Sequence, residues 1–419
     1  MENNKNGFPP EKIKIYGDID SSGIYLIRDF LRRSVIDFEL IDHQPDNLMV
    51  SGEIKAHAVS VELPDGRLLF DPSILEIADS LGLINQPKYS EYDLSIYGAG
   101  PAGLSAAVYA ASEGLKTILI EKEAIGGQAG TSSLIENYMG FPLGISGAKL
   151  AERAREQALK FGAEIILLSE GIKGMFGNGR ICVTLANGQK IVAKTNICAT
   201  GVEYAKLGLR NEERFLNKGL YYGAGASEAF FCNDKDIFIV GGGNSAGQAA
   251  VYFSGFAKTV YMVIRKGALS DTLSYYLITR INSISNIKIL YHSELTAVEG
   301  RDQLEKVRIT NRKDNLDIWY ETAKIFICIG GEPNTDWAVD TPIIRSPAGY
   351  LITGSDLLGT EDFKNCWNID RLPFHLETSV PGCFAAGDVR LNSVKRVASA
   401  VGEGAMAVTF VHQYLTAPR

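Results

Sequence analysis

The pattern of hydrophobic and polar positions divides residues 11–85 into short elements. Apolar residues alternate in some runs and repeat at the helical spacing in others, and Pro64-Asp65-Gly66 marks a turn. The order of strand, helix, three strands and helix predicts a thioredoxin-like domain, followed by a linker at 84–91. The predicted elements are strand 12–16, helix 24–33, strand 38–41, a hairpin over 59–70 and helix 74–81.

Two later segments combine an apolar strand, a glycine-rich turn and a helix. They span residues 94–111 and 237–253. Two such units predict an α/β protein with two Rossmann-like, three-layer domains beside the thioredoxin-like domain. The C-terminal portion, from about residue 332, is expected to pack onto one of the two.

The chain has 419 residues, of which 46% are apolar and 22% charged, as in an ordinary soluble globular protein. The length suggests about three domains, and the net charge of −7 disfavours a nucleic-acid partner. No stretch is long and apolar enough to span a membrane, and residues 1–14 lack the apolar core of a secretory signal. We therefore expect a cytoplasmic location.

The six cysteines contain no Cys-x-x-Cys pair and do not have the spacing of a metal cluster. Cys198, Cys328 and Cys383 stand in apolar runs, where a thiol acts as a small hydrophobic side chain. No metal site is predicted.

The first glycine-rich turn, at residues 98–103, has the Gly-x-Gly-x-x-Gly pattern of a dinucleotide-binding site. Gly98 permits the tight turn, Gly100 lets a pyrophosphate approach the backbone, and Gly103 allows close packing of helix and strand. The free N–H groups at the start of the helix can bind the phosphates. Glu121 follows the next strand, where an acid can accept hydrogen bonds from ribose hydroxyls.

The second turn begins at Gly241 and has alanine, Ala246, in place of the third glycine. At the position equivalent to Glu121 stands an isoleucine, followed by Arg265 and Lys266. Cations there favour a 2′-phosphate and thus NADP(H) over NAD(H). The alternative is a solvated cation pair at a strand end, which leaves NADH open.

Near the C-terminus an apolar strand ends in Gly387-Asp388, and a helix begins near Arg396. The Asp388 carboxylate can lie beside a chain of sugar-like hydroxyls. The positive N-terminus of the helix can face the edge of a flavin ring and stabilise negative charge on it. Alone, Asp388 is equally typical of a helix cap, so this interpretation depends on the whole set of motifs.

Seven motifs follow one another between residues 92 and 419. They are Gly98-Ala-Gly-Pro-Ala-Gly103, Gly126-Gly-Gln128, Glu136-Asn137, Ala199-Thr-Gly201, Gly241-Gly-Gly-Asn-Ser-Ala246, Pro333-Asn-Thr335 and Phe384-Ala-Ala-Gly-Asp-Val389. In order and spacing this region resembles the low-molecular-weight thioredoxin reductases along its entire length. The resemblance implies a discontinuous FAD-binding domain, residues 92–206 and 331–419, with an NAD(P)H-binding domain, residues 207–330, inserted in it. It also implies a homodimer.

The resemblance further implies FAD contacts at Gly127, Gln128, Asn137, Asp388, Arg396 and Ala398. The candidate cofactor-binding residues are Gly98, Gly100, Pro101, Ala102, Gly103, Glu121, Lys122, Gly127, Gln128, Asn137, Ala199, Thr200, Gly201, Gly330, Gly387, Asp388, Arg396, Val397 and Ala398 for FAD, and Gly241, Gly243, Asn244, Ser245, Ala246, Arg265 and Lys266 for NADPH.

The chain departs from that family at its redox centre. Ala224 and Ser227 stand where the family has its two redox cysteines, and Glu228 replaces the acid that follows. Cys232 has no partner nearby in the sequence. Without a cysteine pair, the usual disulfide relay to thioredoxin is excluded.

The N-terminal segment resembles glutaredoxins more weakly. Their Cys-x-x-Cys position here is Asp20-Ser-Ser-Gly23, and residues 50–63 lack the proline of their cis-proline loop. The architecture is similar to bacterial thioredoxin-reductase-like flavoproteins whose centres lack cysteines.

These observations predict an FAD-dependent NAD(P)H oxidoreductase that passes hydride from NADPH to FAD and then directly to an acceptor. The acceptor can be a quinone-like or other small oxidant, dioxygen or a protein electron carrier, and no catalytic residue can be assigned. The alternative is a non-catalytic FAD-binding redox sensor or partner-docking module, motivated by the loss of both thiol sites. The retained second glycine motif with its two cations favours the enzyme.

Overall fold

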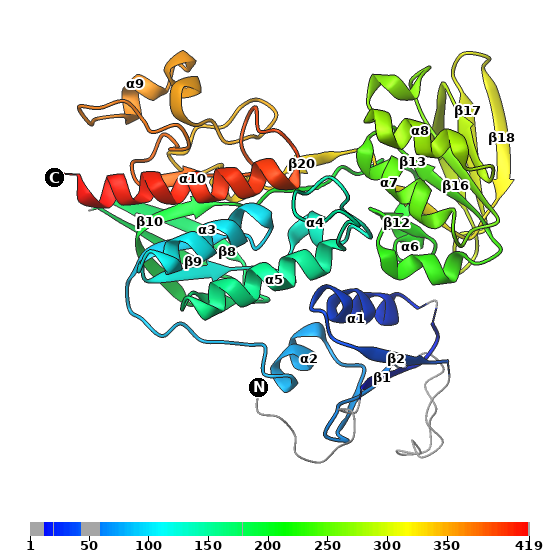
Figure 1. The fold of residues 1–419 in the computed structure, drawn as a ribbon, viewed down its shortest axis with the longest axis horizontal. Coiled ribbons are helices and arrows are strands. Elements are labelled where there is room, and N and C mark those ends of the chain that lie inside the picture. The colour runs from blue at the N-terminus through cyan, green and yellow to red at the C-terminus, as the bar shows by residue number, and fades with distance from the viewer. Residues whose placement is uncertain (1–11, 20, 43–58, 178, 418–419) are drawn as a thin grey trace.

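The computed structural model describes residues 12–19, 21–42, 59–177 and 179–417. Three bodies are visible in Figure 1, and we name them by their residues. The N-terminal unit is residues 12–85, the first nucleotide unit is 92–204 with 331–417, and the second nucleotide unit is 205–330. Asp20 and most of the proline-free stretch before the third strand lie outside the described residues.

The N-terminal unit has the predicted order of elements. Its sheet has the order β2-β1-β3-β4, with β1 parallel to β2 and the other pairs antiparallel. Ser21 caps the first helix, and Ser73 with Glu76 forms a capping box at the second. The elements are β1 Ile13–Tyr16, α1 Ser22–Arg33, β2 Phe38–Ile41, β3 Ser60–Glu62, β4 Leu68–Phe70 and α2 Ile74–Ser80.

The first nucleotide unit has a seven-stranded sheet of order β7-β6-β5-β10-β9-β8, with β21 also paired to β10. Helices cover one face of this sheet, and α10 lies along α3 (Figure 1). Its N-terminal part contains β5 Tyr92–Tyr97, α3 Pro101–Ser112, β6 Thr117–Ile120, α4 Gly127–Gly130, α5 Gly147–Lys160, β7 Glu164–Ile166, β8 Gly171–Gly177, β9 Arg180–Leu185 and β10 Lys190–Cys198. Its C-terminal part contains η3 Asp336–Ala338, η4 Gly354–Gly359, α9 Phe363–Cys366, β21 Cys383–Ala385 and α10 Val397–Thr416.

The return of the C-terminal portion to the first unit is confirmed by the parallel pairing of β21 with β10. Helix α10 packs closely on α3 because Gly404 has no side chain. A Cβ there would lie 2.1 Å from the carbonyl oxygen of Ala102. The two halves of the unit therefore form one body.

The second nucleotide unit has a parallel sheet of order β12-β19-β13-β14-β15 and an antiparallel sheet of order β16-β17-β18. Its elements are α6 Glu212–Phe215, β12 Leu220–Tyr222, η1 Ala226–Cys232, β13 Asp236–Val240, α7 Asn244–Phe253, β14 Thr259–Val263, η2 Leu269–Asp271, α8 Tyr275–Ser283, β15 Ile287–Leu290, β16 Ser293–Glu299, β17 Lys306–Asn311, β18 Leu316–Glu321 and β19 Ile325–Ile327.

The two nucleotide units are connected by a two-stranded antiparallel ribbon. Its strands are β11 Val202–Tyr204 and β20 Gly331–Pro333. The predicted domain boundaries, 206/207 and 330/331, lie at this ribbon. The α/β class with two Rossmann-like domains is confirmed. Among the described residues no helix is long and apolar enough to cross a membrane.

Candidate functional site

The first glycine turn is held by close backbone packing. Gly98 has a φ of +102°, and a Cβ there would lie 2.3 Å from the carbonyl oxygen of Ala199. A Cβ on Gly103 would lie 1.9 Å from the carbonyl oxygen of Gly98. Both positions exclude any side chain, so the tight turn and the close helix packing predicted for these glycines are confirmed.

Gly100, by contrast, faces open space. A Cβ there would meet no atom within 4 Å, and the residue caps α3 without any side-chain hydrogen bond to the helix. The neighbouring Gly127 has a φ of +53° and lies against Gly100. The first N–H groups of α3 thus remain available to an anion.

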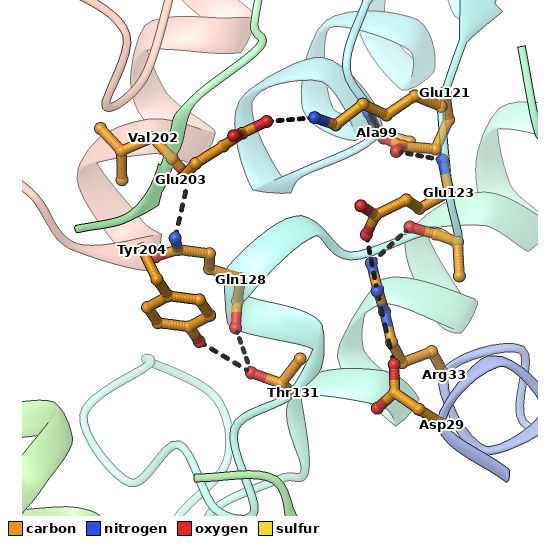
Figure 2. Close-up of polar contacts among 12 residues, drawn as sticks. Asp29, Arg33, Ala99, Glu121, Glu123, Gln128, Thr131, Val202, Glu203 and Tyr204 are labelled. Carbon is orange, nitrogen blue, oxygen red and sulfur yellow. Dashed lines mark hydrogen bonds and ion pairs between the residues drawn. The ribbon is translucent and has the colours of Figure 1, made fainter. Parts of the chain in front are cut away.

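Glu121 holds the turn from the end of β6. Its carboxylate accepts hydrogen bonds from the backbone N–H of Ala99 at 2.6 Å and of Glu123 at 2.9 Å (Figure 2). Burial raises the pKa of Glu121, and the two backbone donors oppose that shift. The expected contact with ribose hydroxyls stays a prediction, because each oxygen already accepts one bond and keeps one acceptor position.

A cavity of about 80 Å³ adjoins this turn. Glu121, Lys122 and Thr200 line it together with aromatic and aliphatic side chains. Asn334 and Trp337, which are not among the predicted site residues, also line the cavity. The Pro-Asn-Thr motif contains Asn334, so a signal for this residue was present.

Contacts around α4 fix the ribbon to the first nucleotide unit (Figure 2). The side-chain amide of Gln128 donates to the carbonyl oxygen of Val202 at 2.8 Å, and Lys122 forms an ion pair with Glu203. Gln128 and Lys122, both expected at FAD, therefore also position β11.

The Gly387-Asp388 turn is anchored by a residue that the sequence patterns did not single out. The Glu403 carboxylate accepts from the backbone N–H of Gly387 at 2.7 Å and pairs with Arg390 at 2.9 Å. Glu403 is the only acidic residue of α10. A single carboxylate among small apolar residues was the sequence feature that could have pointed to it. Burial raises the pKa of half-buried Asp388, and Lys395 opposes that shift.

Helix α10 begins as predicted, with Arg396 as its N-cap and Val397 as its first residue. No side chain caps it, and Arg396 and Ala398 are exposed. The helix N-terminus is thus open beside the Gly387-Asp388 turn. Asn137 lies exposed on the loop between α4 and α5.

The second glycine turn repeats this geometry. Gly241 has a φ of +144°, and a Cβ there would lie 2.2 Å from the carbonyl oxygen of Cys328. Gly243 caps α7 without a side-chain hydrogen bond and faces open space. Ala246 is fully buried, which is consistent with the packing role of the third glycine. The side chain of Asn244 accepts from the backbone N–H of Ser274 at 2.8 Å.

Two cations follow β14 beside the second turn. Arg265 and Lys266 are both exposed, and neither forms an ion pair with another described residue. Ser245 follows Asn244 in the first turn of α7. The structure brings these residues together in the second nucleotide unit, while Gly330, with a φ of +100°, lies at the connecting ribbon.

Helix η1 contains most of the segment that the sequence analysis predicted at the position of the redox cysteines. Glu228 is buried and forms an ion pair with Arg28 of α1. The Cys232 thiol donates to the carbonyl oxygen of Glu228 at 3.2 Å, and burial raises the pKa of Cys232 to about 12. All six cysteines are free thiols in the structure.

Comparison with known proteins gives one family for most of the chain. The sequence profile described as pyridine nucleotide-disulphide oxidoreductase matches residues 92–404. The chain is 32% identical to a thioredoxin reductase of Peptoclostridium acidaminophilum, over 78% of this chain and 98% of that protein. It is 31% identical to a 34.2 kDa protein in the rubredoxin operon of Clostridium pasteurianum, over 78% of this chain and 97% of that protein.

Solved structures agree. The thioredoxin reductase of T. acidophilum has a TM-score of 0.70 at 27% identity and covers 78% of this chain and 100% of its own. The Lactococcus lactis thioredoxin reductase in the FR conformation has a TM-score of 0.68 at 28% identity, covering 77% of this chain and 99% of its own.

Proposed function

The chain belongs to the pyridine nucleotide-disulphide oxidoreductase family and is thioredoxin reductase-like, and on this premise we propose an FAD-dependent NADPH oxidoreductase that works without a protein disulfide. Thioredoxin reductases of this family use FAD and NADPH. The observation that carries the proposal is a contrast within one chain. Both glycine turns keep the open backbone that a dinucleotide needs at Gly100 and Gly243, while the resemblance implies that Ala224 and Ser227 stand at the positions of the redox cysteines.

The residues of the first nucleotide unit fit FAD. The open N-terminus of α3 at Gly100 would hold the pyrophosphate, and Glu121 at the end of β6 would lie toward the adenosine end. Asp388 and the N-terminus of α10 would lie toward the flavin end. When bound, FAD supplies a two-electron carrier between NADPH and an acceptor.

The residues of the protein shape that site. Glu121 holds the first turn through two backbone N–H groups, and Glu403 holds Gly387. The helix N-termini supply positive partial charge where phosphate and reduced flavin carry negative charge. Burial raises the pKa of Asp388, Lys395 lowers it and Glu403 raises it further.

The residues of the second nucleotide unit fit NADPH. The N-terminus of α7 at Gly243 would take the pyrophosphate, as at Gly100. Arg265 and Lys266, exposed and without ion-pair partners among the described residues, provide the charge that a 2′-phosphate requires. NADH has no 2′-phosphate to pair with these two cations.

The experiment that tests the function is anaerobic mixing of the FAD-loaded protein with NADPH. Bleaching of the flavin absorbance within the dead time or within seconds supports the oxidoreductase. An absorbance that persists for many minutes, with NADPH bound, contradicts it and supports the non-catalytic sensor instead. The reduced protein is then mixed separately with a quinone, with dioxygen and with a ferredoxin-like carrier. The rate of flavin reoxidation ranks these classes of acceptor.

We further propose that the protein acts as a homodimer through a groove on the first nucleotide unit. The groove, of about 820 Å³, lies between α3, α5 and α10 and includes Tyr138 and Phe141 of the loop after α4. Met139 and Leu143 of the same loop are 94% and 91% exposed. Apolar side chains this exposed are typical of an interface, and a second copy of the chain can cover them.

A further inference from the structure

One helix of the N-terminal unit, α1, contacts both nucleotide units. We propose that α1 is a latch that fixes the second nucleotide unit relative to the first. In Figure 1 this helix lies between the N-terminal sheet and the two nucleotide units. The proposal concerns the orientation of the units and goes beyond the proposed redox function.

One end of the latch is fastened to the first nucleotide unit. Arg33 forms an ion pair with Glu123 at 3.1 Å and donates to the carbonyl oxygen of Ala124 at 2.9 Å (Figure 2). Ala124 is 1% exposed and belongs to the hydrophobic core of the N-terminal unit, against which Leu168 also packs. Because the two units share a core, the N-terminal unit and the first nucleotide unit move together.

The other end is fastened to the second nucleotide unit. Arg28 forms an ion pair with Glu228, and the two side chains are only 3% and 1% exposed. The Arg28 guanidinium also stacks over the ring of Phe231, 4.4 Å from its centroid. The ring of Tyr25 packs on Tyr221 with 5.2 Å between centroids. These contacts pack Glu228 and Phe231 of η1 against α1.

Within the part of the chain that the structure describes, two further links hold the second nucleotide unit to the first. The covalent connection is the ribbon of β11 and β20, two strands of three residues each. Arg280 of α8 and Glu136 form an ion pair across the two nucleotide units at 2.7 Å, but their side chains are 45% and 30% exposed. Exposed pairs contribute little and are screened by salt, so this pair adds little to the restraint.

The buried pair is suited to opening and closing. Among the described residues, Nε of Arg28 and Oε2 of Glu228 have no hydrogen-bond partner. A buried ion pair with unsatisfied groups gains little over its loss of hydration, whereas one charge left buried alone is strongly unfavourable. The second nucleotide unit can therefore turn only when α1 separates from η1 and both charges reach water.

The test is hydrogen exchange of the full-length protein, read at the amides of α1 and η1, with small-angle scattering in parallel. Glu228→Gln leaves Arg28 buried without a counter-charge, so exchange in both segments should rise by roughly tenfold or more and the radius of gyration should increase. Arg280→Met, which removes the exposed pair between the nucleotide units, is the matched control and should leave exchange in both segments unchanged.

A double variant, Arg28→Met with Glu228→Leu, separates latch release from damage to the second nucleotide unit. Replacing both charges by apolar side chains should restore slow exchange and the compact particle. Unchanged exchange in Glu228→Gln would overturn the latch. So would fast exchange that persists in the double variant, because it would show that position 228 supports only its own unit.

Discussion

The carboxylate of Glu403 joins two segments of the candidate FAD site by accepting the backbone N–H of Gly387 at 2.7 Å while pairing with Arg390 at 2.9 Å. Gly387 itself has a φ of +81° and lies against Ala102 of the first glycine motif. A side chain of α10 thus sets the position of the turn that carries Asp388.

Glu403→Gln should weaken FAD binding about tenfold, because the amide keeps one acceptor but turns an NH₂ group toward Arg390. Equilibrium dialysis of FAD against the apoprotein measures this change. The control variant is Glu113→Gln, which removes a carboxylate that contacts His412 of α10. This variant should bind FAD as tightly as the parent. Equal affinity of Glu403→Gln and the parent would remove Glu403 from the site.

Arg265→Ala should raise the KM for NADPH far more than that for NADH. A charge-assisted contact with phosphate contributes roughly 1.5–3 kcal/mol, which corresponds to about a 10- to 150-fold loss. Arg301→Ala removes an exposed arginine from the same unit and serves as the control. Equal changes for the two nucleotides would refute the assignment of the 2′-phosphate to Arg265.

The Cys232 thiol should resist alkylation across the neutral range. Burial raises its pKa to about 12, and the thiolate, the reactive form, grows only as the pH approaches that value. Mass spectrometry after iodoacetamide treatment at about pH 7 and about pH 9 should find Cys232 unmodified, with the unfolded protein as positive control. Rapid modification of the native protein at about pH 7 would mean that the thiol is accessible and ionised.

Met139→Glu combined with Leu143→Glu should convert the proposed dimer into a monomer, since charged side chains at an apolar interface lose hydration without gaining a partner. Light scattering after size-exclusion chromatography reads the mass. Leu316→Glu changes an exposed leucine of β18 in the second nucleotide unit and should leave the mass unchanged. A parent that is already monomeric would contradict the proposed interface.

The sequence predicted elements whose cause is local. The N-terminal strands and helices follow from periodicity and caps within a few residues, and the glycine turns follow from backbone positions that admit no side chain. The sequence could not predict the contact of Arg28 with Glu228, because the partners are 200 residues apart and Arg28 stands in no recognisable pattern.

In the candidate site, too, local features could be predicted and contacts between distant residues could not. The motif predicted Glu121 and its place after β6, but the hydrogen bonds of its carboxylate to Ala99 and Glu123 depend on how the following turn folds back. Asn334 and Trp337 come after the inserted unit in the sequence, and they line the same cavity as Glu121. Such convergence is a property of the tertiary structure, not of any local pattern.

One further pair of thiols lies on neighbouring strands of the first nucleotide unit. Cys198 on β10 and Cys383 on β21 lie on adjacent strands, and burial together with the neighbouring Cys198 raises the pKa of Cys383. The sequence spacing had given these cysteines no pairing. Both thiols are buried, so we expect no electron transfer through them, and a Cys383→Ala variant checks that expectation.

Anaerobic reductive titration of the FAD-loaded protein tests the central claim most directly. A thioredoxin reductase holds one electron pair on its flavin and a second in its disulfide. Here Ala224 and Ser227 cannot hold the second electron pair, so full reduction should consume two electrons per FAD. No thiolate-to-flavin charge-transfer absorbance should appear. The Cys232→Ser and Cys383→Ala variants should give the same result as the parent. Consumption of four electrons by the parent, falling to two in either variant, would contradict an enzyme that works without a protein disulfide.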